Sequence, residues 1–131
     1  MSSEMIILLF SVILHFVWIM IPAAKAIQEY GIMRQAGSRD GLPEPSIFLS
    51  RARRLVDNSQ ENLVIFAIFV LMAHVLNVHS EMTVFGAQLY FFGRLTHGII
   101  YLVGWPLVRP LAWAVGLVGT ALFPIEILAA F

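Results

Sequence analysis

Long apolar stretches separated by short polar joints are the dominant pattern of this chain of 131 residues. The apolar blocks run from residue 5 to about 24, from 63 to 76, from 82 to 104 and from 107 to 131. A helix needs roughly 20 mostly apolar residues to cross the hydrocarbon core of a bilayer. Short joints place consecutive helices antiparallel and adjacent. The pattern therefore predicts an all-α integral membrane protein, a four-helix transmembrane bundle with up-down-up-down topology.

We expect a single domain over residues 1–131, with helices at about 5–28, 50–78, 82–104 and 107–130. The polar segment 25–45 contains QAGSRDGLPEP, and its glycine and proline content predicts a loop. The first block could be mistaken for a signal peptide. Its leader MSSE carries Glu4 and no lysine or arginine, so we expect a retained helix.

Composition supports the membrane interpretation and excludes several function classes. Hydrophobic residues make up 60% of the chain and charged residues only 12%, where a soluble domain has near a quarter. The formal net charge is zero, so no overall field would attract nucleic acid. No cysteine is present, which excludes disulfides and thiolate chemistry, and the four histidines lack metal-ligand spacing.

The distribution of basic residues predicts the orientation. Most of them lie in or beside the first loop, whereas the amino terminus and the second joint have none. Arg109 follows the third joint, on the same side as the first loop. By the positive-inside rule, loops 1 and 3 are expected to be cytoplasmic and both termini to lie on the opposite side.

Polar residues are expected inside the second span. The block 63–76 would be roughly 21 Å long as a helix, which is too short for a core of about 30 Å. The helix must therefore recruit residues at its cytoplasmic end. Arg54, Asn58 and Glu61 follow one another at i, i+4 and i+7, so they share one face. Ionisable groups inside a membrane span are functional candidates by default.

The third helix carries a matching stripe. Arg94, His97 and Tyr101 fall at i, i+3 and i+7, again on one face. Arg94 is expected near the middle of the bilayer, where an unpaired arginine costs at least about 2.5 kcal/mol. Since the second helix enters from the same side, Glu61 and Arg94 are expected to form an ion pair.

Two interpretations of these stripes stay open. In one, Glu61 and Arg94 form a structural clamp with polar neighbours. In the other, the cluster binds an anionic, carboxylate-bearing ligand, because one carboxylate cannot neutralise all the guanidinium groups. Those groups belong to Arg51, Arg54, Arg94 and Arg109.

His15 is interpreted as a packing or interfacial residue. For Glu126 the sequence allows solvation at the far interface, a subunit contact or a protonated carboxyl.

The motifs RLVDNSQE (54–61) and GRLTHGIIYLVG (93–104) resemble those of the MAPEG family, the membrane-associated proteins in eicosanoid and glutathione metabolism. The resemblance covers nearly the whole chain. It implies a homotrimer that binds glutathione, as a co-substrate, between neighbouring subunits. By this resemblance, Arg109 is the catalytic residue that stabilises the thiolate, while Asp57 stands where prostaglandin-forming members carry an arginine. The resemblance assigns glutathione binding to Arg51, Arg54, Asn58, Glu61, Arg94, His97 and Tyr101.

The leading hypothesis is a glutathione-dependent membrane transferase or peroxidase-like enzyme that conjugates or reduces lipophilic electrophiles at the bilayer. Its partners would be membrane lipids, a lipophilic small molecule and two further copies of the chain, with no nucleic acid. The alternative is a catalytically silent MAPEG-like protein that binds a lipid or another anion in the same basic cleft. A small proton-coupled multidrug exporter is disfavoured, because the span 5–24 contains no acidic residue.

Overall fold

The computed structural model describes all residues from 1 to 131 and contains only helices. They are α1 (Ser3–Tyr30), α2 (Ile32–Ala36), α3 (Ile47–Val75), α4 (Glu81–Val103) and α5 (Arg109–Ala129). The all-α prediction is confirmed, but the chain has five helices instead of four. The additional helix α2 lies in the segment predicted as a loop, where good helix formers stand between Gly31 and Gly37.

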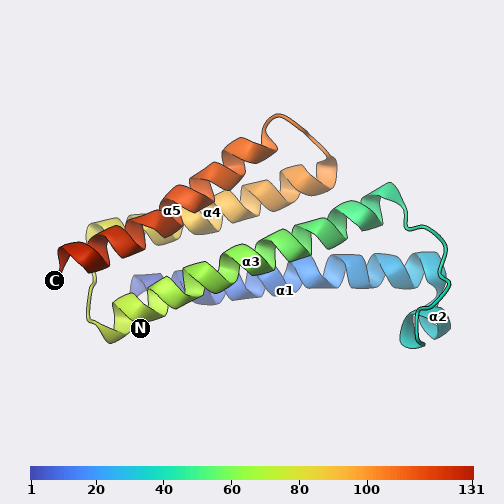
Figure 1. Cartoon of the computed structure of the whole chain (residues 1–131), viewed down its shortest axis with the longest axis horizontal. Helices are drawn as coiled ribbons and strands as arrows, with labels where there is room; N and C mark the ends of the chain where they lie inside the picture. Colours follow the sequence, from blue (N-terminus) through green and yellow to red (C-terminus); the bar gives the residue numbers. More distant parts are fainter.

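The four long helices form two antiparallel pairs, α1 with α3 and α4 with α5 (Figure 1). Figure 1 shows both termini at the same end of the molecule as the connection between α3 and α4. We call this the termini end. The opposite end, which we call the loop end, holds residues 31–46 and the connection 104–108.

Three of the helices, α1, α3 and α5, are long and apolar enough to cross a membrane by length and composition. Helix α4 has 23 residues, a sufficient length, but Gln88, Arg94 and His97 lower its mean hydropathy. Large apolar side chains are exposed along the outer faces of the long helices, as expected for contact with lipid tails. The chain is an integral membrane protein, and the crossing of the bilayer by α4 stays a prediction.

Serine side chains begin three of the long helices by accepting hydrogen bonds from free backbone N–H groups. Ser2 accepts from the Met5 N–H at 3.3 Å, and Ser46 accepts from the Leu49 N–H at 3.1 Å. Ser80 and Thr83 form a reciprocal capping box at the start of α4. At the loop end, Gly104 terminates α4 with a φ of 88°, a left-handed conformation that favours glycine.

The largest apolar core lies between the middle of the bundle and the termini end. Phe66 of α3 stacks on Tyr90 of α4 at 3.8 Å between ring centroids, and Phe123 of α5 meets Phe66 edge-on at 5.7 Å. These aromatic rings connect the two helix pairs. The polar residues predicted for the site lie beyond this core, toward the loop end.

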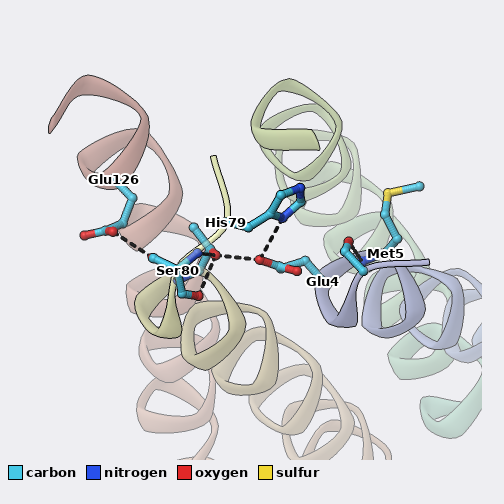
Figure 2. Close-up of polar contacts among 7 residues, drawn as sticks. Glu4, Met5, His79, Ser80 and Glu126 are labelled. Carbon is cyan, nitrogen blue, oxygen red and sulfur yellow. Dashed lines mark hydrogen bonds and ion pairs between the residues drawn. The ribbon is translucent and has the colours of Figure 1, made fainter. Parts of the chain in front are cut away.

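A polar cluster closes the termini end (Figure 2). The Thr83 hydroxyl donates to Oε1 of the buried Glu4 carboxylate at 2.6 Å, and His79 Nδ1 lies 3.3 Å from the same oxygen. The Ser80 hydroxyl donates to Glu126 Oε2 at 2.7 Å. The Glu126 carboxylate therefore has a partner within the chain, on the connection between α3 and α4.

Candidate functional site

The two polar stripes predicted from the sequence meet within one chain. Arg54 Nε of α3 donates a hydrogen bond to the Tyr101 hydroxyl of α4 at 3.3 Å. One helical turn further along α3, Asn58 Oδ1 accepts a hydrogen bond from Arg94 Nη2 at 2.7 Å. The helical spacing in the sequence therefore identified the faces of α3 and α4 that lie opposite each other.

Tyr101 is also contacted from α5 and from its own helix. The guanidinium carbon of Arg109 lies 4.9 Å from the centroid of the Tyr101 ring, a cation–π geometry. The His97 ring lies 5.5 Å from the Tyr101 ring. We define the basic cluster as Arg54, Asn58, Arg94, His97, Tyr101 and Arg109.

The prediction of an ion pair between Glu61 and Arg94 is wrong within the single chain. Glu61 is exposed, and the only acid–base contact within salt-bridge distance in the chain is His79–Glu4. Arg94 bonds the neutral Asn58 amide instead. The physical reason is rotation, because Glu61 lies roughly 60° around the α3 axis from Asn58. Glu61 lines an open groove of about 520 Å³ with Asp57, Gln60 and Val64.

Arg51 does not join the basic cluster either. Its guanidinium packs against Gly104, where α4 ends, so closely that a Cβ atom there would lie 2.7 Å from Arg51 Cζ. Arg51 therefore occupies the junction between α3 and the end of α4. The left-handed φ of 88° at position 104 favours glycine there.

The basic cluster has an exposed and a buried layer. Arg54 and Arg109 are exposed, whereas Arg94 and His97 keep only 3% and 2% of their surface accessible. Arg94 Nε and Nη1 and His97 Nδ1 are buried and have no hydrogen-bond partner in the chain. Buried polar atoms are nearly always paired, so unpaired ones in a native fold require an explanation.

Positive charge in the cluster is not balanced within the chain. The guanidinium groups of Arg54 and Arg109 contact Tyr101, that of Arg94 bonds Asn58, and no carboxylate lies within salt-bridge distance of any of them. Planar guanidinium donors match the two oxygens of a carboxylate, and they also stabilise other anions such as a thiolate. The arrangement is suited to binding an anionic ligand.

The sequence model of the MAPEG family matches residues 5–129 of the chain. The chain belongs to the MAPEG family. Comparison with curated proteins and with solved structures gave no match. The MAPEG family includes glutathione-dependent transferases and peroxidases.

The sequence patterns did not indicate that His15 and Ser59 of this MAPEG chain bond each other inside the bundle. His15 of α1 shares a hydrogen bond of 2.9 Å between its Nδ1 and the Ser59 hydroxyl of α3. His15 was expected to be a packing or interfacial residue, yet a polar side chain in the middle of an apolar helix is itself a functional signal. Ser59 directly follows Asn58 and points roughly 100° around the helix from it, so Ser59 lies off the predicted stripe.

Proposed function

We propose that this MAPEG protein is a glutathione-dependent transferase or peroxidase-like enzyme that conjugates or reduces lipophilic electrophiles arriving from the bilayer. The observation that carries the proposal is the basic cluster, in which Arg54, Arg94 and Arg109 converge without a carboxylate partner. Glutathione has two carboxylates and an ionisable thiol, and the MAPEG family generally uses it.

The exposed layer of the cluster provides the first contacts for the ligand. Arg54 and Arg109 reach Tyr101 from opposite helices, and both are accessible. Helix α5 begins at Arg109 without a side-chain cap, so the positive end of its dipole adds to the attraction of an anion. The accessible Arg54 would hold a glutathione carboxylate, and Glu61 would accept a hydrogen bond from the amino group.

Arg109 would act on the sulfur atom as the catalytic residue. A thiolate is the nucleophilic form of a thiol, and a nearby guanidinium favours it. The thiol proton leaves to solvent, the sulfur electron pair forms a bond to the electrophilic carbon, and a leaving group such as halide departs with its bonding electrons.

The open groove at Glu61 supports assembly with further copies of the chain. Asp57, Gln60 and Glu61 are exposed on a helix that can span a membrane, where uncovered charges are costly. A homotrimer, the general state of the family, would cover this groove and complete the glutathione site between subunits. In the proposed orientation α4 also crosses the bilayer, and the loop end faces the cytoplasm.

A second candidate function is a catalytically silent MAPEG protein that binds a lipid or another anion. It is favoured by the burial of Arg94 and His97, which leaves only part of the cluster accessible. Calorimetry with glutathione separates the two functions, since a protein that binds phosphate-bearing lipid but no glutathione belongs to the second class.

Conjugation of glutathione to an aryl halide by purified protein in nanodiscs tests the enzyme directly. Arg109→Ala is expected to lower the conjugation rate by about 10²-fold, because one donor to the developing anion is lost. Arg34→Ala removes the same charge from α2, outside the cluster, and should leave the rate unchanged. Equal rates for wild type and Arg109→Ala would refute the role of Arg109.

A further inference from the structure

Helix α3 is held from two sides in the middle of the bundle by consecutive residues. Ser59 bonds His15 of α1 at 2.9 Å, and Asn58 bonds Arg94 of α4 at 2.7 Å. Apart from the contact of Glu29 with Ser46 at the start of α3, the His15–Ser59 bond is the only side-chain hydrogen bond between α1 and α3. The pair therefore fixes α1 against α3 at the level of the basic cluster.

These two bonds determine the rotation of α3 about its own axis. Consecutive helical residues point roughly 100° apart, so the two bonds leave α3 in different directions. Any rotation of α3 about its axis would therefore move both Asn58 and Ser59 away from their partners. Both bonding groups lie inside the bundle, since Ser59 keeps 4% of its surface accessible and Arg94 keeps 3%. The rotation matters because it carries Arg54 and Glu61 with it.

Stability alone gives little reason for the His15–Ser59 pair. Hydrogen bonds between membrane helices contribute little to net stability, and apolar side chains would pack in the same space. A single hydrogen bond instead favours one rotation of α3 over the others. Because Ser59 follows Asn58, this bond acts at the level of the face of α3 that carries the proposed ligand-binding residues.

We propose that His15, acting through Ser59, is a positioning residue that sets the rotation of the α3 face carrying Arg54, Asn58 and Glu61. The proposal rests on the proposed function, because its consequence is the affinity for glutathione. It adds α1 to a site otherwise built from α3, α4 and α5. His15 itself does not touch the ligand in this arrangement.

Calorimetry of glutathione binding in nanodiscs tests the consequence. His15→Leu and Ser59→Ala are each expected to weaken binding by about threefold, because each removes one interhelical hydrogen bond of modest free energy that holds α3 in the binding rotation. The double variant should be no weaker than either single variant, since both remove the same bond. His15→Asn places a polar amide near the position of Nδ1 and should restore most of the affinity. Ser11→Ala on α1 is the control, because its hydroxyl bonds only Ile7 of the same helix.

A second measurement reports the rotation without any ligand. The chain has no cysteine, so single cysteines at Arg53 and Ala52, near the loop end of α3 and outside the groove, can be labelled selectively with a water-soluble maleimide. The exposed position 53 should react faster than the buried position 52, and this contrast should shrink in the His15→Leu background but persist with His15→Asn.

The outcomes separate the two proposals. A wild-type protein that does not bind glutathione refutes the proposed function, while the labelling contrast still decides the role of His15. A His15→Leu variant with wild-type affinity and an unchanged labelling contrast overturns the positioning role. Equal losses for His15→Leu and His15→Asn also overturn it, because they would mean that only the shape of the imidazole matters.

Discussion

At the scale of single residues, Tyr101 is the meeting point of the basic cluster. Its hydroxyl accepts from Arg54, its ring lies under Arg109, and His97 stands beside it one turn earlier on α4. Beneath this layer, Arg94 has one hydrogen-bond partner in the chain, the Asn58 amide oxygen. The side-chain oxygen of Asn58 is therefore the single acceptor that compensates a buried cation.

We expect Asn58→Leu to destabilise the protein by about 1–3 kcal/mol, the typical cost of leaving a buried donor unpaired. The measurement is thermal unfolding of the purified protein in nanodiscs. Asn62→Leu is the matched control, because the Asn62 side chain bonds only a backbone carbonyl of its own helix. The same loss of stability in both variants would mean that the Asn58–Arg94 bond contributes nothing specific.

At the scale of helices, glycines allow α4 and α5 to pack closely enough to bring Arg109 to Tyr101. A Cβ atom at Gly93 would lie 2.8 Å from the Gly116 nitrogen, and one at Gly116 would lie 3.3 Å from Arg94 Cδ. Backbone therefore meets backbone along this helix pair, and the Arg94 stem packs on α5 where a larger residue would displace it. The position of the buried guanidinium depends on both helices.

Gly93→Ala is expected to lower stability by about 1–3 kcal/mol, the usual effect of overpacking, since neither backbone can move away freely. Separation of α4 from α5 should also reduce glutathione conjugation through Arg109. Gly37→Ala is the control, because the added Cβ would lie 3.4 Å from the nearest backbone atom and the φ is ordinary. Thermal unfolding and the aryl halide assay measure the two effects, and a Gly93→Ala protein as stable as the control would contradict the close packing.

At the scale of the whole molecule, charge is divided between the two ends. All basic residues other than Arg94 lie at or near the loop end. The termini end instead carries Glu4, Glu81 and Glu126, with two of these carboxylates bonded inside the cluster of Figure 2. The positive-inside rule then favours one orientation of the molecule in the bilayer.

Single cysteines test this orientation. Ser38→Cys in the loop between α2 and α3 should be labelled by a membrane-impermeant maleimide only from the cytoplasmic side. Phe131→Cys at the C-terminus should be labelled only from the opposite side, and both positions are exposed. Labelling of both positions from one side would contradict the proposed arrangement of spans.

Helical periodicity and composition, which are properties of the sequence itself, determined the membrane class, the four long helices and the two polar stripes. Spacing along one helix fixes which residues share a face. The face with Arg54 and Asn58 could therefore be matched to the face with Arg94 and Tyr101, without the individual contacts. The short helix α2 was missed because its five residues lie between loop signals.

The tertiary structure alone decided which member of one stripe meets which member of the other. The rotation and the offset between helices depend on how side chains from distant segments pack, as where Trp18 of α1 lies against Gly98 of α4. No local pattern encodes these quantities. For this reason Arg94 was paired with Glu61 in the sequence and with Asn58 in the fold, and the bond between His15 and Ser59 became visible only once α1 and α3 stood side by side.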